Sequence, residues 1–70
     1  MNQEVLGKLV RQRREELGLQ QQDLAEMGGL TAKTLYLVES GRGNPSLQTL
    51  LRLLEVLGLE LSVHLRKTGS

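Results

Sequence analysis

The stretch that most constrains this chain is residues 20–41, QQQDLAEMGGLTAKTLYLVESG, because two short helical patterns there are separated by a pair of glycines. The first pattern predicts a helix over residues 20–27, with Leu24 and Ala25 turned inward. Gly28-Gly29 then supply the positive φ values that end a helix, since glycine adopts the left-handed region without a steric penalty. We therefore expect a short helix followed by a tight glycine turn.

The second pattern predicts a helix that begins after Thr31, a good N-cap residue. Its inward residues are Leu35 and Val38, which lie three residues apart on one helix face. Four residues lie on or beside the opposite face, namely Lys33, Thr34, Tyr36 and Leu37. An exposed helix face is therefore held at a fixed angle by a small core, which is the arrangement that lets a helix enter the major groove of DNA.

Glycines that follow apolar, periodic segments predict four helices in all. The first helix, over residues 2–17, carries an apolar stripe formed by Val5, Leu6, Leu9, Val10 and Leu17. Ser46 caps a fourth helix over residues 47–57, whose buried face is expected to consist of Leu47, Leu50, Leu51, Leu54 and Leu57. Leu53 and Val56 widen this apolar surface, so part of the helix faces either a wider core or a second subunit.

After Gly58 the period changes to two and predicts a half-buried β-strand over residues 59–67, with apolar positions Leu59, Leu61, Val63 and Leu65. It is the only strand signal, and a lone strand leaves its backbone donors and acceptors without partners. We expect it to pair with the same segment of a second copy and so to form a homodimer. A frayed tail, or an edge offered to a different protein, stays open as an alternative. Residues 68–70 are expected to be a disordered tail.

Composition bounds the class of protein. A chain of 70 residues forms one domain whose core is marginal alone, and without cysteines it has no disulfides to reinforce that core. No segment is apolar enough for a membrane span or signal peptide, so we expect a cytoplasmic protein, associated with the nucleoid when bound to DNA. The net charge of +1 is too mild to indicate nucleic-acid binding by itself. A single tyrosine is the only aromatic residue, which argues against stacking on single strands.

The sequence argues against an enzyme. It has one histidine, one aspartate and no cysteine, and no paired carboxylates stand in a catalytic context. His64 falls on the polar side of the predicted strand, where a surface role is expected rather than catalysis or metal binding. We therefore expect no catalytic residue, no metal, no cofactor and no small-molecule substrate.

With these elements placed, the sequence resembles the helix-turn-helix domains of phage Cro and phage repressor proteins, the XRE family. The resemblance covers nearly the whole chain, and its core is LGLQQQDLAEMGGLTAKTLYLVESGRGNPSLQTLLRLLEVLGLEL. It implies a mainly α, lambda-repressor-like domain of four helices over residues 1–58, followed by the dimerisation strand. The closing NPSLQTLLRLLEVLGLELSVHLRK is similar to the HipB-type antitoxin branch, in which a strand after the last helix builds a shared sheet in the dimer.

Carried over position by position, the resemblance implies three sets of residues. Base contacts would come from Ala32, Lys33, Thr34, Tyr36 and Leu37. Phosphate contacts would come from Gln20, Gln21, Thr31, Arg42 and Asn44. A partly buried salt bridge would join Arg14 and Glu39 and align the first helix with the recognition helix.

Two functions follow from these expectations, and a purely structural adaptor that never meets DNA stays open as a third possibility. In the first, a homodimer binds a palindromic operator in double-stranded DNA and represses transcription. In the second, the chain is chiefly a protein-interaction module, an antitoxin that neutralises a HipA-type kinase toxin and binds DNA only to regulate its own operon. The recognition helix is short of the Arg, Gln and Asn side chains that read bases in pairs of hydrogen bonds, so the sequence supports a place in the groove better than a choice of bases.

Overall fold

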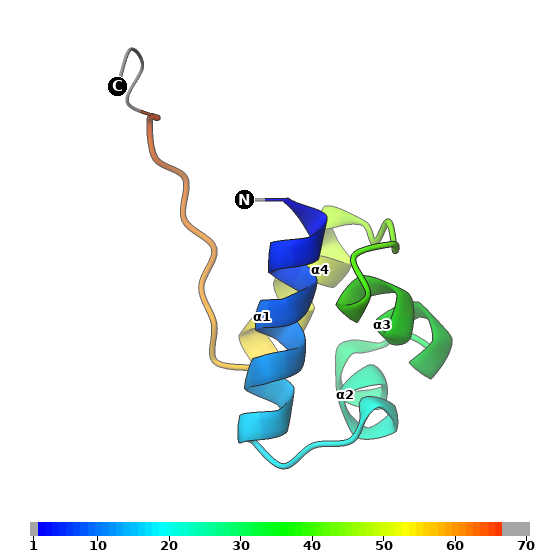
Figure 1. The fold of residues 1–70 in the computed structure, drawn as a ribbon. Helices are drawn as coiled ribbons and strands as arrows, with labels where there is room; N and C mark the ends of the chain where they lie inside the picture. Colours follow the sequence, from blue (N-terminus) through cyan, green and yellow to red (C-terminus); the bar gives the residue numbers. More distant parts are fainter. Residues whose placement is uncertain (1, 67–70) are drawn as a thin grey trace.

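The computed structural model describes residues 2–66, which form four helices and an extended C-terminal segment (Figure 1). The number and order of the helices match the prediction, and each observed end lies within a residue or so of the expected one. None of the helices in residues 2–66 is long and apolar enough to span a membrane. The helices are α1 (Gln3–Glu16), α2 (Gln21–Gly28), α3 (Ala32–Glu39) and α4 (Leu47–Val56).

Local capping explains where these helices begin. Three of them start after a short polar residue whose side-chain oxygen accepts a hydrogen bond from a backbone N–H three residues on, which satisfies one of the free donors of the first turn. The fourth, α2, follows Gln20, whose own N–H donates to the Asp23 carboxylate at 2.9 Å. The three caps and their donors are Asn2 with Val5 (2.9 Å), Thr31 with Thr34 (3.1 Å) and Ser46 with Thr49 (3.1 Å).

The turn between α2 and α3 uses its two glycines differently. Gly29 has a φ of +74°, as expected of a helix C-cap, but Gly28 is the last helical residue, so the prediction of a positive φ there was wrong. A Cβ on Gly28 would lie 2.7 Å from the side chains of Leu30 and Leu53. Gly28 is therefore required by close packing between the turn and α4, whereas Gly29 is required by backbone conformation.

All four helices contribute to one core. The expected inward residues of α2 and α3 are buried, and Leu30 packs against the core from the turn. At Gly7, α1 crosses the end of α3 so closely that an added Cβ would overlap the carbonyl oxygens of Val38 and Glu39. The buried core consists of Val10, Leu24, Ala25, Leu35, Leu53, Leu54 and Leu57.

The buried face of α4 agrees with the prediction only in part: Leu54 and Leu57 are buried and Leu50 packs against the core, as expected. Leu53 is fully buried, whereas Leu47 and Leu51, which were expected to face the core, are 63% and 45% exposed. The helix packs against α2 with its buried side shifted toward Leu53, which its broad apolar surface allows. Three residues of the predicted stripe on α1 are also more than 40% exposed, namely Val5, Leu9 and Leu17.

The C-terminal segment, residues 59–66, contains no strand in the described chain and leaves the end of α4 as an extended tail that projects beyond the helices (Figure 1). The predicted strand is therefore absent from the single chain, because no other extended segment among residues 2–66 offers its backbone a partner. Leu59 packs against the chain's own core, while Val63 and Leu65 are 92% and 100% exposed. Residue 67, the predicted end of the strand, and the predicted tail over residues 68–70 lie outside the described residues.

Candidate nucleic-acid interface

One side of α3 faces away from the core. Ala32, Lys33 and Tyr36 are exposed there, and Thr34 and Leu37 lie half-buried at its edges. The opposite side carries Leu35 and Val38 into the core, as their spacing predicted. The five residues expected to contact bases are therefore brought together on one surface, with three presented fully and two at the margin.

The N-terminus of α3 is held by a pair of threonines. The Thr31 hydroxyl accepts from the Thr34 N–H at 3.1 Å and shares a further hydrogen bond with the Thr34 hydroxyl at 2.9 Å. Thr31 is thus first a cap of α3, and its expected phosphate contact would use the remaining capacity of the same oxygen.

The loop after α3 places a cation beside the exposed side of that helix. The Arg42 guanidinium carbon lies 5.7 Å from the centre of the Tyr36 ring, within the range of a cation–π contact, and both residues are exposed. The Gln3 side-chain amide donates to the carbonyl oxygen of Gly43 at 2.8 Å and ties the loop to α1. Asn44, the other loop residue expected to contact phosphate, is exposed as well.

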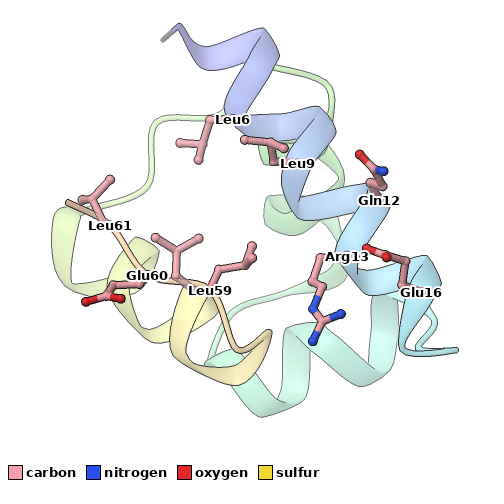
Figure 2. Close-up of a pocket in the computed structure, with 9 residues that line it drawn as sticks. Leu6, Leu9, Gln12, Arg13, Glu16, Leu59, Glu60 and Leu61 are labelled. Carbon is pink, nitrogen blue, oxygen red and sulfur yellow. The ribbon is translucent and has the colours of Figure 1, made fainter. Parts of the chain in front are cut away.

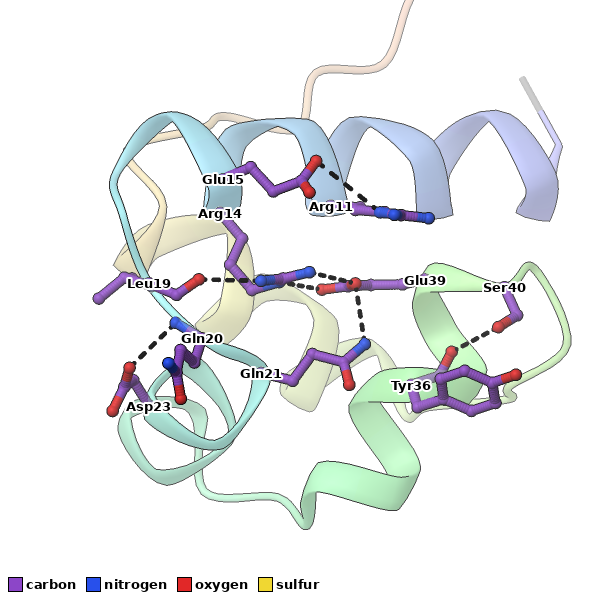
Figure 3. A network of polar contacts seen from close by, with 10 residues as sticks. All are labelled: Arg11, Arg14, Glu15, Leu19, Gln20, Gln21, Asp23, Tyr36, Glu39 and Ser40. Carbon is purple, nitrogen blue, oxygen red and sulfur yellow. Dashed lines mark hydrogen bonds and ion pairs between the residues drawn. The ribbon is translucent and has the colours of Figure 1, made fainter.

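Arg14 and Glu39 form a nearly buried ion pair that joins α1 to the end of α3 (Figure 3). Arg14 Nε donates to Glu39 Oε2 at 2.7 Å and Arg14 Nη2 donates to Glu39 Oε1 at 3.0 Å. The side chains are only 11% and 4% exposed. The hydrogen bond from Arg14 to Glu39 raises the pKa of the guanidinium above its ordinary value, against the opposing effect of burial. The resemblance implied this pair, and the structure brings it together with two-point geometry.

Two further partners of this ion pair were missed by the sequence analysis. Arg14 Nη1 donates to the carbonyl oxygen of Leu19 at 2.8 Å, and Gln21 Nε2 donates to Glu39 Oε1 at 3.1 Å (Figure 3). Gln21 was expected to contact phosphate, and its amide is instead directed toward Glu39 in the free chain. The sequence feature that could have indicated this contact is the polar side chain of Gln21 at the start of α2, on the side of that helix that faces α3. The network fixes α1, α2 and α3 to one another around the exposed side of α3.

An apolar groove of about 260 Å³ lies on another side of the molecule, between α1, α4 and the C-terminal segment (Figure 2). Of the residues expected at the dimer interface, Leu59 and Leu61 line this groove, whereas Val63 and Leu65 extend beyond it. Arg13 closes one end of it and donates from Nε to the carbonyl oxygen of Leu57 at 2.8 Å, which satisfies a free acceptor at the C-terminus of α4.

Comparisons with known proteins agree with this geometry. A helix-turn-helix family model matches residues 10–63. An uncharacterised HTH-type transcriptional regulator of Methanothermobacter thermautotrophicus is 46% identical over 52 residues, which make up 74% of this chain and 75% of the relative. Among solved structures, the biofilm master regulator SinR in complex with DNA is 32% identical with a TM-score of 0.70, over 79% of this chain and 89% of SinR.

A structure of the HipA–HipB–O2–O3 complex contains a chain that matches over 96% of this chain and 94% of its own length, with a TM-score of 0.81. Its sequence identity of 24% makes this a likeness of fold alone. The match to the family model spans most of the chain, and the relative is similar over most of both lengths. The chain therefore belongs to the XRE-like helix-turn-helix family of transcriptional regulators, which are DNA-binding proteins and not enzymes.

Proposed function

We propose that this chain is a sequence-specific transcriptional repressor that binds a palindromic operator in double-stranded DNA as a homodimer. The observation that carries the proposal is the free side of α3, which a nearly buried ion pair and a capped N-terminus hold rigidly against α1 and α2. Rigid presentation matters because a helix that enters the major groove must keep its side chains in register with the base edges.

The chemistry of this side favours a few specific contacts. Lys33 can donate to the O6 and N7 acceptors of guanine, and Ala32 can contact a thymine methyl group. Tyr36, steadied by Arg42, offers a phenolic hydroxyl that both donates and accepts. Thr34 and Leu37 lie at the margins and would contact bases only where the groove wall closes on α3.

Phosphate contacts would flank these base contacts on both sides. Gln20 and Gln21 stand at the N-terminus of α2, where free N–H groups and the helix dipole favour an anion. Arg42 and Asn44 stand in the loop after α3, and Thr31 caps its start. Such contacts position the protein on the duplex without reading sequence.

Dimerisation is proposed to use the C-terminal segment and the apolar surface beside it. Leu61 is 43% exposed, and Val63 and Leu65 are almost fully exposed, although all three are large apolar side chains. Pairing of two segments across a two-fold axis would satisfy their backbones and cover these side chains together. It would also set two α3 helices in successive major grooves, about 34 Å apart.

Selection of bound sequences from a random duplex pool, followed by binding assays at several salt concentrations, tests the function. The expected result is a palindrome with two half-sites about one helical turn apart. Equal affinity for the selected sequences and for random duplex would refute sequence-specific binding, and a single half-site with a 1:1 stoichiometry would refute the dimer.

A HipA-type kinase toxin is the second candidate partner. It is favoured by the C-terminal sequence and by a fold match to the HipA–HipB–O2–O3 complex that extends over 96% of this chain. In this function, neutralisation of the toxin is primary and DNA binding serves autoregulation. Co-expression with a kinase-like protein encoded next to this chain tests it. Co-purification of the two supports a toxin partner, whereas separate elution of two folded proteins argues against it.

A further inference from the structure

We infer that Arg11 of α1 is a further phosphate-contacting residue, and that Glu15 holds its guanidinium in the free protein as an exchangeable substitute for a DNA phosphate. This inference rests on the proposed DNA-binding function. It adds a residue outside the α2–turn–α3 motif and its following loop, and it gives Glu15 a restraining effect on DNA affinity.

The structure separates the neighbouring arginines of α1 by what each one binds. Arg13 is committed to the carbonyl oxygen of Leu57, and Arg14 is committed to Glu39 and Leu19. Among residues 2–66, Arg11 makes only a single ion pair, from Nε to Glu15 Oε1 at 3.7 Å. Two of the three cations therefore serve the fold, and Arg11 is the one whose charge is available to a ligand.

Arg11 also lies in the right place. It lines a polar pocket of about 260 Å³ between α1, α2 and α3, together with Gln21, Tyr36 and Ser40. Gln21 and Tyr36 are proposed DNA contacts, so the pocket opens beside the surface that DNA would approach. Glu39 also lines the pocket, but Arg14 binds both of its carboxylate oxygens and neutralises it. Figure 3 shows the Arg11 side chain extending along α1 above this network.

Glu15 is well suited to be exchanged. The two side chains of the pair are 62% and 57% exposed, and an ion pair so exposed to water and salt contributes little to stability. The Glu15 carboxylate lies 3.7 Å from Arg11 Nε, which is an ion pair without a hydrogen bond, whereas a phosphate oxygen could accept a charge-assisted hydrogen bond from the same guanidinium. Transfer of Arg11 from Glu15 to DNA therefore costs little, and the small stability of the Arg11–Glu15 pair is what opposes binding in the free protein.

The first test measures the affinity of the selected duplex for wild type, Arg11→Ala and Arg11→Lys from about 50 to 200 mM salt. One lost phosphate contact lowers the magnitude of the log–log salt slope by about 0.9, so the affinity ratio of wild type to Arg11→Ala should change about 3.5-fold over this range per protomer. A dimer that loses two contacts should show about a 12-fold change. Arg11→Lys should retain most of the slope because it keeps the charge.

The second test removes the Glu15 carboxylate, which takes the place of a DNA phosphate beside Arg11 in the free protein. Glu15→Gln should tighten DNA binding by about 1.5- to 5-fold per protomer, which corresponds to the worth of an exposed ion pair. Glu16→Gln is the matched control, since it makes the same change in net charge from the next residue of α1, which lines the apolar groove instead. The gain from Glu15→Gln above that of Glu16→Gln should disappear in an Arg11→Ala background, as coupling through Arg11 requires.

The outcomes separate this inference from the proposed function. If wild type binds the selected DNA and Arg11→Ala has the same salt slope, the Arg11 contact is wrong while the function stands. If Glu15→Gln and Glu16→Gln have equal effects, or the extra gain survives in the Arg11→Ala background, the exchange is wrong. If wild type itself shows no DNA binding, the proposed function fails and this inference fails with it. Thermal midpoints of all variants should stay close to that of wild type, since the Arg11–Glu15 pair is exposed.

Discussion

Removal of the Glu39 carboxylate is the sharpest test of how this fold is held together. Glu39 accepts three hydrogen bonds, two from Arg14 and one from Gln21, and its side chain is only 4% exposed. Glu39→Gln keeps the shape of the side chain but removes its charge, so the Arg14 guanidinium would remain 11% exposed without a counter-ion. Glu39→Ala removes the acceptor as well.

The expected magnitude follows from this burial. Loss of one partner of a buried ion pair costs about 3 to 5 kcal/mol, because the other charge stays desolvated and unpaired. A domain of this length has a free energy of unfolding of only about 3.5 to 10 kcal/mol. Since 1 kcal/mol shifts the midpoint of a small domain by about 4 to 8 °C, Glu39→Ala should lower it by about 12 to 40 °C.

Thermal melts followed by far-UV circular dichroism measure this shift, at a fixed protomer concentration because the proposed dimer would add to the apparent stability. Glu15→Gln is the control, since it breaks an ion pair whose side chains are more than half exposed and should cost at most about 1 kcal/mol. A Glu39→Gln midpoint no lower than that of Glu15→Gln would show that the Arg14 pair is only superficial. If Glu39→Ala does not fold at all, Arg14→Lys gives the milder comparison, because lysine keeps the charge but not the two-point geometry.

The difference in stability between wild type and Glu39→Gln should depend on pH in a definite direction. Glu39 raises the pKa of Arg14, so the stability it contributes is complete below the pKa of the unfolded chain and is lost only as pH rises through the higher pKa of the folded state. Both values lie far above neutrality. The difference between wild type and Glu39→Gln should therefore be constant between about pH 6 and 9. A difference that disappears toward pH 9 would mean that Arg14 is not the group left unpaired.

Three further substitutions test the exposed side of α3, the C-terminal interface and the contact between α1 and α3 one at a time. Lys33→Ala should weaken DNA binding in a gel shift and leave the thermal midpoint nearly unchanged, and a large drop in stability would contradict the exposure of α3. Val63→Asp should convert the dimer to a monomer in sedimentation experiments without loss of helix signal, because Val63 is 92% exposed in the single chain; an intact dimer would refute the C-terminal interface. Gly7→Ala should cost about 1 to 3 kcal/mol in urea unfolding, despite the better helix propensity of alanine, because its Cβ meets the carbonyl oxygens of Val38 and Glu39; a more stable variant would show that α1 and α3 can separate freely.

The parts of the fold that were predictable from sequence are those that local chemistry determines. Thr31 and Ser46 are N-caps whose side-chain oxygens need only a backbone N–H three residues away, so the starts of α3 and α4 follow from the chain itself. Gly29 ends α2 because its backbone conformation excludes most other residues. Leu35 and Val38 are buried together because helical spacing places them on the same side.

Features that depend on how helices approach one another were not predictable. The apolar surface of α4 covers both sides of the helix, so periodicity could not decide that Leu53 would be buried and Leu47 exposed. Gly7 and Gly28 gave no sign in the sequence that each marks a close approach of a second element. The resemblance singled out Arg14 as the partner of Glu39, but nothing in the sequence showed that Arg13 would bind the carbonyl oxygen of Leu57 while Arg11 keeps only an exposed ion pair with Glu15.

The C-terminal segment shows a second limit of structure prediction from sequence. Its alternation of apolar and polar residues is a strand pattern, yet a strand exists only with a partner for its backbone, and the single chain supplies none within the described residues. In the proposed homodimer, the same segment of the second copy would be that partner. Val63 and Leu65, almost fully exposed here, are the residues whose burial would report that assembly.

The candidate site divides in the same way into geometry that the fold determines and contacts that DNA would determine. The ion pair, the cap and the loop place α3 firmly, but the exposed side offers Lys33 and Tyr36 where a strong reader of bases would offer arginine or glutamine. Affinity should then come mainly from phosphate contacts, whose strength depends steeply on salt. Discrimination among sequences would rest on contacts to thymine methyl groups and on Lys33. It would also rest on the energy needed to deform the operator to the half-site spacing that the proposed dimer requires, since this energy depends on the DNA sequence. If deformation outweighs contacts to bases, the selected operators should be more alike in the base pairs between the half-sites than in the half-sites themselves.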